Sequence, residues 1–432
     1  KLLAMVAEKC AEIDDDEYAM QLADAIEDHG LRSQATERVA LVLAGKGQIE
    51  KAREIADSMA HPDFVLAGIA AKQAEDGDEA AARGTVAEID FPSARGSASQ
   101  HIASSLIAKG ENEGAVAWLD DGVTAAETIE HDEERIRTLS DLGSLFVEAK
   151  RNDKSIETFA VALGFAEQLD NTHRDFFLGA CALGFLNAGS LELADQALDL
   201  ITDKTQLGSA LVGVARDSWK KDDKDDALEA LEEACAIVRS QREIEIRDSR
   251  ARNRLLTVIA AQFAGFGKTE RGAEIARENP DPAEQTEALS QIAQILIVQN
   301  EDELARQTIN EIAEDADRLS ALIGLADAKL KSGDEPGSIE MLKEAATLAE
   351  TVPQLPARST AMIELAARFA DQGDAATALE LSLENLGIVS EVRDQSTQAV
   401  LLANLSFLST RNDLDIAASG QKTIQQILGA NY

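Results

Sequence analysis

The sequence is poor in the residues that cross-link, break or anchor small folds. Its 432 residues include three cysteines, seven prolines and only 4% aromatic residues. The cysteines, Cys10, Cys181 and Cys235, are far apart, which excludes a disulfide-rich secreted domain and offers no C-x-x-C metal spacing. They indicate small packing residues in a reducing compartment, so we expect a cytoplasmic protein.

Basic residues and long apolar runs are also scarce. The 41 Lys and Arg residues stand against 79 Asp and Glu residues, which gives a net charge of −38. Such a field repels nucleic acids and anionic membranes, so we expect no nucleic-acid partner. No apolar run approaches the roughly 20 residues of a transmembrane helix, so no membrane insertion is expected. The chain begins at Lys1 without a methionine, which predicts a trimmed start from which a targeting peptide would be missing.

What the sequence has in abundance is helix-forming residues, arranged in a repeated frame. A small residue is followed seven positions later by a turn residue, and five positions after that by a second small residue. The first small sites are Ala7, Ala40, Ala70, Ala103, Gly143, Ala182, Ala215, Ala260, Ala293, Ala326, Ala366 and Leu405. The turn sites are Asp14, Gly47, Gly77, Gly110, Lys150, Gly189, Asp222, Gly267, Asn300, Gly333, Gly373 and Asn412. The second small sites are Ala19, Ala52, Ala82, Ala115, Ser155, Ala194, Ala227, Gly272, Ala305, Ser338, Ala378 and Ala417.

This frame has a direct physical meaning. Two helices joined by a tight turn cross closely only where their side chains are small, and Gly or Asn at the turn adopts the left-handed backbone that ends the first helix. An apolar residue four positions after the second small site, such as Leu119 or Phe159, stays on the same helical face. The sequence therefore predicts an all-α superhelix, or solenoid, of about twelve antiparallel helical hairpins.

The frame resembles the tetratricopeptide repeat, in which a small residue, a turn glycine and A-x-x-x-[FYL] recur along the chain. The resemblance covers essentially all of the sequence and implies a protein-binding solenoid. The family's aromatic positions are mostly Leu, Ile or Ala here, and its proline after the second helix is usually missing. Some units are near 40 residues long rather than 33, so hairpins of the HEAT type remain the structural alternative.

The repeats themselves are duplicated. Residues 77–200 align without a gap to residues 300–423 at an offset of 223 positions. Within them, Ala82-Arg83-x-Thr85-x-x-Glu88-Ile89 matches Ala305-Arg306-x-Thr308-x-x-Glu311-Ile312. We expect two blocks of six hairpins, residues 1–203 and 204–432, with the second continuous with the first.

Arginines recur eight residues before the first small site, in the first turn of the predicted helices. Helix N-termini disfavour cations, so a compensating contact is required. The main interpretation is an ion pair or a carbonyl cap that clamps one hairpin to the previous one. The alternative is a ladder that binds anionic groups. The set comprises Arg32, Arg95, Arg135, Arg174, Arg252, Arg318 and Arg358.

Two surfaces are candidate binding sites. In the tetratricopeptide family the first helix of each hairpin lines the concave surface, and that register places a small, neutral to slightly basic set of residues there. These candidate partner-binding residues are Ser97, Gln100, Ser104, Arg137, Ser140, Ser144, Phe176, Arg216, Trp219 and Arg254. The second candidate is an Arg-rich junction formed by Arg242, Arg247, Arg250 and Arg252. It is either a solvated, self-paired helix end or a docking point for an acidic partner or a second copy of this acidic protein.

The sequence contains no catalytic or metal-binding signature. H-E-x-x-H, G-x-S-x-G and P-loop motifs are absent, and the five histidines are 30 or more residues apart. We therefore expect no catalysis, no cofactor and no metal. The preferred hypothesis is a non-catalytic scaffold or adaptor that binds a partner peptide or helix in the concave groove. The alternative is a ligand- or peptide-sensing repeat module of a larger regulatory protein. The sequence leaves the oligomeric state open.

Overall fold

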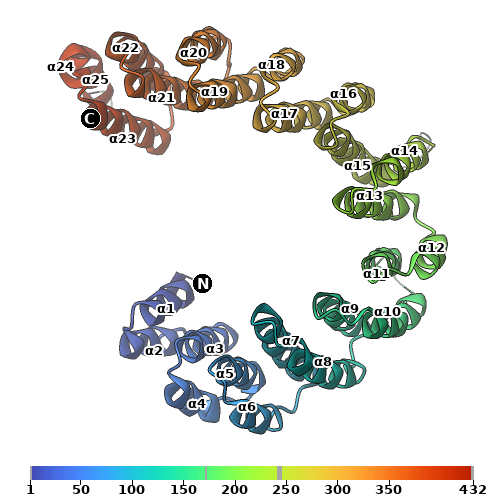
Figure 1. The fold of residues 1–432 in the computed structure, drawn as a ribbon. Coiled ribbons are helices and arrows are strands. Elements are labelled where there is room, and N and C mark those ends of the chain that lie inside the picture. Colours follow the sequence, from blue (N-terminus) through green and yellow to red (C-terminus); the bar gives the residue numbers. More distant parts are fainter. Residues whose placement is uncertain (1, 171–172, 241–245, 430–432) are drawn as a thin grey trace. The chain divides into compact units, whose positions relative to one another are not determined.

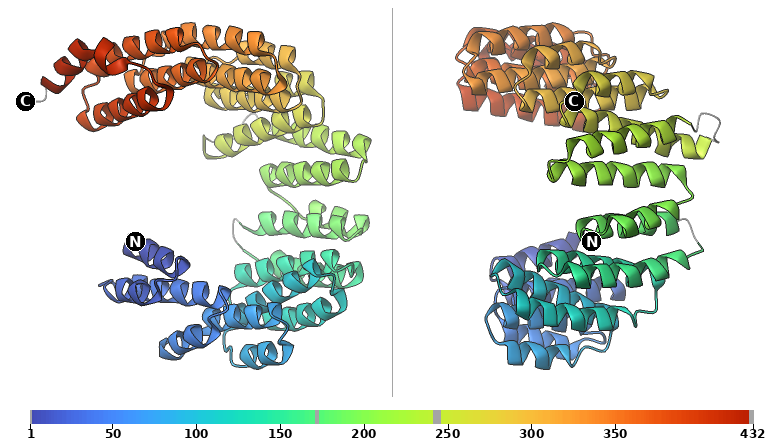
Figure 2. Two further views of the ribbon diagram at one scale, coloured as in Figure 1. Left: turned by 60° about the vertical axis from the view of Figure 1, so that its left-hand side comes forward. Right: turned by 45° about the vertical axis from the view of Figure 1, so that its right-hand side comes forward.

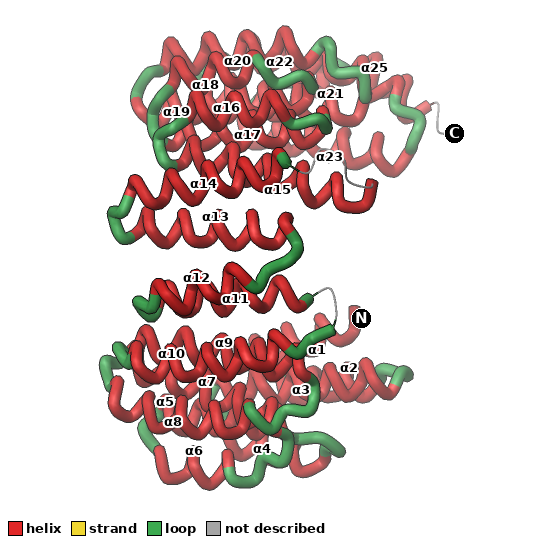
Figure 3. Tube along the Cα trace, turned by 90° about the vertical axis from the view of Figure 1, so that its right-hand side faces the viewer, coloured by secondary structure: helices red, strands yellow, loops and turns green. Residues whose placement is uncertain are grey.

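The computed structural model describes residues 2–170, 173–240 and 246–429, and the regular structure within these ranges is entirely helical (Figure 3). Successive helices pair as antiparallel hairpins, which confirms the predicted all-α, tetratricopeptide-like hairpin architecture. The chain forms two compact units, Lys1–Ala230 (unit 1) and Leu231–Tyr432 (unit 2). The expected blocks, 1–203 and 204–432, remain a proposal about the ancestry of the sequence.

Unit 1 contains six complete hairpins and most of a seventh (Figure 1). Its helices are α1 (Leu2–Glu12), α2 (Asp16–Asp24), α3 (His29–Gly45), α4 (Ile49–Ser58), α5 (Asp63–Glu75), α6 (Glu79–Val86), α7 (Pro92–Ala108), α8 (Asn112–Ala126), α9 (Asp132–Glu148), α10 (Asn152–Glu167), α11 (Arg174–Asn187), α12 (Leu191–Asp199), α13 (Lys204–Lys220) and α14 (Lys224–Arg239). The boundary with unit 2 falls inside α14.

Unit 2 continues the same pattern. Its helices are α15 (Ile246–Gly265), α16 (Thr269–Glu278), α17 (Pro282–Val298), α18 (Asp302–Asn310), α19 (Asp315–Ser332), α20 (Glu335–Ala349), α21 (Leu355–Asp371), α22 (Ala375–Glu391), α23 (Gln395–Asn412), α24 (Ile416–Ser419) and α25 (Gln421–Gly429). The last hairpin differs from the others, because two short helices, α24 and α25, follow α23.

The turns confirm the predicted frame at eleven of its twelve positions. Among the described residues, positive φ angles occur at each predicted turn site from Asp14 to Gly373, and otherwise only at Asp413. At Gly47, for example, the amide donates to Ala44 O at 2.9 Å, and the Gln48 amide donates to Leu43 O at 2.9 Å. This pair of bonds is a Schellman motif, which satisfies the last carbonyls of the first helix.

Left-handed turns occupied by ordinary side chains are sites where stability can be gained. Lys150 has φ of +61° at the end of α9, a conformation that costs a residue with a Cβ about 1–2 kcal/mol. We expect Lys150→Gly to raise the free energy of unfolding by about 0.5–1 kcal/mol, since glycine removes this strain at some entropic cost. Thermal denaturation measures the change. The matched control is Gly77→Ala at φ +90°, which we expect to lower stability. A loss of stability in Lys150→Gly would contradict the strain argument.

The predicted frame is wrong in the last hairpin. The turn falls at Asp413, with φ of +52°, rather than at Asn412, because α23 runs one residue further than the frame allows. Ala417, the predicted small contact, is exposed, and Gly420 is buried against Leu386 instead. The frame fails here because the chain after Asp413 forms two short helices in place of one long one.

The small sites let the helices of each hairpin approach closely. All of the first small sites from Ala7 to Ala366 are buried, as are the second small sites from Ala19 to Ala378. Gly272 marks one close crossing, because a methyl group added there would overlap the carbonyl oxygen of Ala260 on the facing helix. Interlocking of this kind explains why the second small site tolerates only Gly, Ala or Ser.

In unit 1 the odd-numbered helices form one layer and the even-numbered helices the other (Figures 1 and 2). Each odd-numbered helix from α1 to α11 contacts the next odd-numbered helix. Among the described residues, the even-numbered helices α2 to α12 make no comparably close contacts with one another. When neighbouring helices are closer together in one layer than in the other, the two-layered unit curves towards the layer with the closer helices. The odd-helix face of unit 1 is therefore its concave face.

Five of the seven recurrent arginines cap carbonyl groups just before their own helices, as predicted, namely Arg32, Arg95, Arg135, Arg318 and Arg358. Arg32 Nε donates to Ile26 O at 2.7 Å, Arg135 Nε to Ile129 O at 2.7 Å, and Arg358 Nε to Val352 O at 2.8 Å. Each acceptor lies just beyond the preceding even-numbered helix, so the arginine clamps a hairpin to the one before it. Arg174 differs, because its Nη1 reaches forward to Leu200 O at 3.2 Å.

Two buried carboxylates join hairpins in a way that the sequence analysis missed. Asp63 and Asp175 are each 6% exposed, near the start of α5 and α11. Asp175 Oδ2 accepts hydrogen bonds from the amides of Thr202 (2.8 Å) and Asp203 (2.6 Å), just before α13. Asp63 Oδ1 accepts equivalent bonds from the two amides before α7. Each carboxylate thereby fixes the start of the next hairpin.

Ion pairs link successive even-numbered helices on the opposite layer. In unit 1 they include Lys51–Asp16 (2.6 Å), Arg83–Asp121 (3.1 Å) and Lys154–Asp120 (2.8 Å). Unit 2 contains a further set between α14 and α20, namely Arg271–Glu232, Arg277–Glu311 and Arg306 with Glu340 and Glu344. Much of the scarce positive charge of the chain is therefore used between neighbouring hairpins.

Candidate functional site

The structure places nine of the ten candidate partner-binding residues on four neighbouring helices of unit 1. The helices α7, α9, α11 and α13 contact one another in that order. Ser97, Gln100 and Ser104 lie on α7, Arg137, Ser140 and Ser144 on α9, Phe176 on α11, and Arg216 and Trp219 on α13. The tenth, Arg254, lies on α15 in unit 2, where it pairs with Glu284 at 3.5 Å.

None of these side chains is buried. Ser104, Arg137, Ser144, Phe176, Arg216 and Arg254 are exposed, and Ser97, Gln100, Ser140 and Trp219 are half-buried. Ser140 Oγ donates to Ile136 O at 2.8 Å and Ser144 Oγ to Ser140 O at 2.9 Å. Both hydroxyl groups thus donate hydrogen bonds to carbonyl groups of their own helix, and they do not require a polar group from a partner. The serine side chains are short and protrude little from the helix.

Two aromatic side chains, those of Phe176 and Trp219, are the largest apolar groups among these candidate residues. Phe176 is 54% exposed although it packs edge to face on Phe177, with ring centroids 5.4 Å apart. Trp219 lies below the ammonium group of Lys224, which is 5.5 Å from the ring centroid. A large apolar side chain left in solvent on a packed helix layer is a typical anchor for a partner.

Phe64 belongs to the same surface and was missed by the sequence analysis. It is 44% exposed on α5, which contacts α7. Phe64 lies six residues before Ala70, just as Phe176 lies six residues before Ala182, so the register contained the signal. We define the "aromatic row" as the four residues at this register on α5, α7, α9 and α11, namely Phe64, Ser97, Arg137 and Phe176.

An acidic residue lies beside the aromatic row. Asp141 follows Arg137 by one turn of α9 and is exposed to solvent. Partial desolvation by the surrounding protein nevertheless raises the pKa of its carboxyl group, and the charge of Arg137 opposes this effect. A side chain that is both exposed and partly desolvated is expected on the inside of a curved surface. Arg137 also lines a hollow of about 670 Å³ with His131 and Leu169.

The Arg-rich junction is only partly visible. Arg242 lies outside the described residues, as does the side chain of Arg247. Arg250 is exposed and Arg252 is half-buried, and Arg252 Nη2 donates to Asn253 Oδ1 at 3.0 Å. Arg239, at the end of α14, forms an ion pair with Glu278 at 2.6 Å. Polar contacts within unit 2 therefore hold Arg252 and the neighbouring Arg239, whereas Arg250 is exposed.

In the described part of the chain, no three His, Cys, Asp or Glu side chains come together as ligands for a metal. Within the same residues, no helix combines the length and the apolar character needed to cross a bilayer. Burial raises the pKa of the Cys181 thiol to about 12, so it is present as the thiol at neutral pH.

The fold defines a helical-repeat protein. No family model matches the sequence, and no curated protein matches it. Similar solved structures include Ton1535 from Thermococcus onnurineus NA1, which is 13% identical with a TM-score of 0.28 and covers 94% of this chain and 99% of its own. Naa15/Naa10 bound to HypK-THB is 14% identical, with a TM-score of 0.35 and coverages of 98% and 67%. The APC/C hetero-tetramer Cut9-Hcn1 is 11% identical, with a TM-score of 0.23 and coverages of 93% and 83%.

Proposed function

We propose that this chain is a non-catalytic protein-interaction scaffold of the tetratricopeptide type. It holds a peptide or helix of a partner protein against the odd-helix face of unit 1. The observation that carries the proposal is the aromatic row, in which Phe64 and Phe176 stand exposed at one register with Ser97 and Arg137 between them. Exposed phenylalanines at matching positions of separate repeats are difficult to explain by packing alone.

The spacing of the row sets the size of the partner segment. Neighbouring packed helices are about 8–10 Å apart, so three steps from α5 to α11 span roughly 25–30 Å. An extended peptide of about eight or nine residues covers that distance, as does a helix of about 16 to 20 residues. We expect the partner segment to carry an apolar side chain near each end and an acidic group near Arg137.

Affinity capture from extracts of the native cell tests the proposal. We expect the full-length chain to retain a stoichiometric protein partner, and Phe176→Ala or Phe64→Ala to reduce capture about tenfold or more, as for interface hot spots. The matched control is Leu191→Ala, which removes an exposed apolar side chain (66%) from the start of the even-numbered helix α12. Equal losses in all three variants, or a tightly bound small molecule with no protein partner, would contradict the scaffold proposal.

A further inference from the structure

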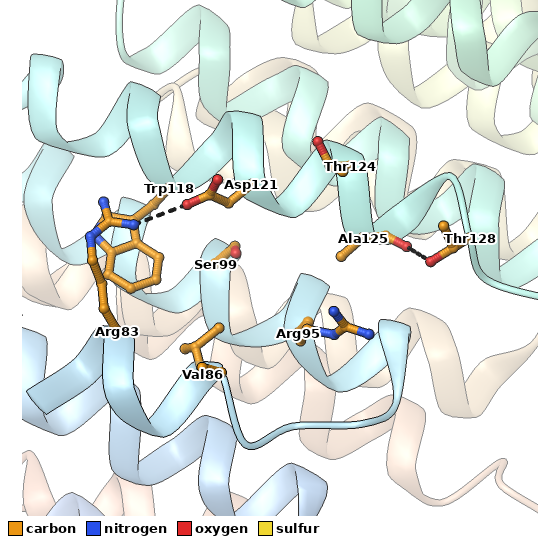
Figure 4. Close-up of a pocket in the computed structure, with 10 residues that line it drawn as sticks. Arg83, Val86, Arg95, Ser99, Trp118, Asp121, Thr124, Ala125 and Thr128 are labelled. Atoms are coloured by element: carbon orange, nitrogen blue, oxygen red, sulfur yellow. Dashed lines mark hydrogen bonds and ion pairs between the residues drawn. The ribbon is translucent and has the colours of Figure 1, made fainter.

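A second type of site lies away from the aromatic row. A hollow of about 440 Å³ is set between α6 and α8, with α7 as its floor (Figure 4). No residue of the aromatic row lines it. Its volume is within the range of small-molecule sites, about 300–1,000 Å³. The hollow therefore has the size for a ligand of its own.

The hollow has an aromatic end and a cationic end. At one end the guanidinium of Arg83 covers the ring of Trp118, 4.3 Å from its centroid, and pairs with Asp121 at 3.1 Å. Arg95 lies at the other end, with Ser99 between them (Figure 4). Ser99 on the floor and Trp118 at the aromatic end are 2% and 1% exposed, so both side chains are shielded from bulk water.

Two donors of this hollow are buried without a hydrogen-bond partner. They are the indole Nε1 of Trp118 and the Nε of Arg95. Arg95 Nη2 donates to Asp90 O at 3.2 Å, and among the described residues no carboxylate pairs with its charge. Burying these two N–H groups without acceptors is unfavourable, as is leaving the half-buried Arg95 guanidinium without a counter-charge. An occupant with a negatively charged acceptor at the Arg95 end would satisfy the Arg95 guanidinium.

Unit 2 contains an equivalent hollow of about 380 Å³ between α18, α19 and α20. Every one of its lining residues lies 223 positions after a lining residue of the first hollow, which is the offset of the internal duplication. The matched pairs are Ala87 and Asn310, Arg95 and Arg318, Ser99 and Leu322, Asp121 and Glu344, Thr124 and Thr347, Ala125 and Leu348, and Thr128 and Thr351. The two copies of the duplicated segment therefore place a hollow at the same sequence positions.

The two hollows differ in charge and in their floors. Arg318 pairs with Asp315 at 2.6 Å, whereas the position equivalent to Asp315 in unit 1 is Pro92. The floor residue Ser99 is replaced by the buried Leu322 in unit 2. Only the unit 1 hollow thus combines a guanidinium without a carboxylate partner and a polar floor. Unit 2 supplies a natural control that lacks both features.

We propose that the hollow of unit 1 binds a small organic monocarboxylate, whose carboxylate pairs with Arg95 and whose apolar body lies towards Trp118. Guanidinium groups bind carboxylates through paired, charge-assisted hydrogen bonds. A dianion such as phosphate is disfavoured, because Asp121 lines the same hollow and the chain carries a net charge of −38. This site is separate from the scaffold function, and it would supply the ligand input of a sensing module.

Fluorescence titration of the full-length Trp219→Phe variant tests the site, because Trp118 is then the only tryptophan. Benzoate is the probe, and we expect a saturable change with a Kd of about 1–10 mM, as ligand efficiency implies for a fragment of this size. The neutral isostere benzamide should bind at least about tenfold more weakly. No saturable response to benzoate up to about 50 mM, well above that Kd, would overturn the proposal. So would a saturable response to inorganic phosphate alone.

Three variants in the same background locate the site. We expect Arg95→Met to weaken benzoate binding about tenfold or more, and Pro92→Asp to weaken it about fivefold by supplying the counter-charge found in unit 2. Pro92→Asp retains Arg95 and places an acid at a helix N-terminus, where it is favourable, so the fold is expected to remain intact. Arg318→Met, the matched change in unit 2, should leave the affinity unchanged. Unchanged binding in Arg95→Met and Pro92→Asp, or an equal loss in Arg318→Met, would refute the assignment.

Discussion

Phe159→Ala is expected to lower the free energy of unfolding of unit 1 by about 3–5 kcal/mol, the range for removing a buried phenylalanine. Phe159, on α10, is 2% exposed and packs tilted against Phe185, with ring centroids 6.0 Å apart. Its ring fills the space left by two glycines, Gly143 on α9 and Gly184 on α11. One side chain therefore joins its own hairpin to the next, and its removal leaves a cavity at both contacts.

Urea denaturation followed by tryptophan fluorescence measures this loss, since Trp118 and Trp219 both belong to unit 1. Phe176→Ala is the matched control, because Phe176 is 54% exposed and its removal should change stability by no more than about 0.5 kcal/mol. A similar cost in the two variants would contradict the packing argument.

A double-mutant cycle tests the glycine contact itself. A methyl group at Gly184 would overlap the ring of Phe159, so Gly184→Ala alone should cost about 1–3 kcal/mol. In the Phe159→Ala background the ring is absent, and we expect most of that cost to disappear. Strict additivity of the two changes would show that the glycine is not required by the phenylalanine.

Asp175→Ala has the second large expected effect, a loss of about 3–5 kcal/mol in unit 1. The carboxylate pairs with Arg174 at 2.8 Å and accepts hydrogen bonds from the amides of Thr202 and Asp203. Alanine leaves these amides without their acceptor and the half-buried guanidinium without its counter-charge. The same urea denaturation measures this loss of stability. The control is Asp203→Ala, which removes only an N-cap bond to the Gln206 amide (2.9 Å) and should cost about 1 kcal/mol.

The pH dependence of this difference has a definite sign. Burial raises the pKa of Asp175, but hydrogen bonds from Asp203 and Thr202 and the charge of Arg174 together lower it below its ordinary value. The unfolded chain therefore binds the proton more readily, so the stabilisation is fully present above about pH 4 and is lost as the pH falls below that. We expect the stability gap between wild type and Asp175→Ala to narrow below about pH 4. A gap that widens on acidification would contradict this role.

The sequence predicted the hairpins well because their geometry depends on local spacing. The left-handed turns at Asp14 and Lys150 were located without a glycine, since position in the frame mattered more than residue type. The arginine caps at Arg32, Arg135 and Arg358 followed from the cost of placing a cation at a helix N-terminus. The frame failed at Asn412 and Ala417, where the chain after Asp413 forms two short helices, α24 and α25, in place of one long one.

The sites were harder to predict because they depend on contacts between hairpins. The hollow beside Trp118 draws residues from three helices, and the lack of a counter-charge for Arg95 becomes evident only when Asp315 is compared with Pro92. Phe64 shares the register of Phe176, six residues before a first small site, but the register alone does not tell how far α5 leaves that side chain in solvent. Asp63 and Asp175 accept hydrogen bonds from amides that lie 27 or 28 residues further along the chain, so local spacing does not reveal these contacts.

The two layers of unit 1 have different elastic properties. The odd-numbered helices are joined mainly by close packing, which salt does not weaken, although they include the ion pair Arg38–Glu8 (3.4 Å). Ion pairs such as Lys51–Asp16 and Lys154–Asp120 join the even-numbered helices, and salt screens these pairs. Bending the unit away from its concave face compresses one layer and stretches the other, so its stiffness has a mechanical part and an electrostatic part. Salt screens only the electrostatic part. We therefore expect unit 1 to become more compliant as the ionic strength of its surroundings rises.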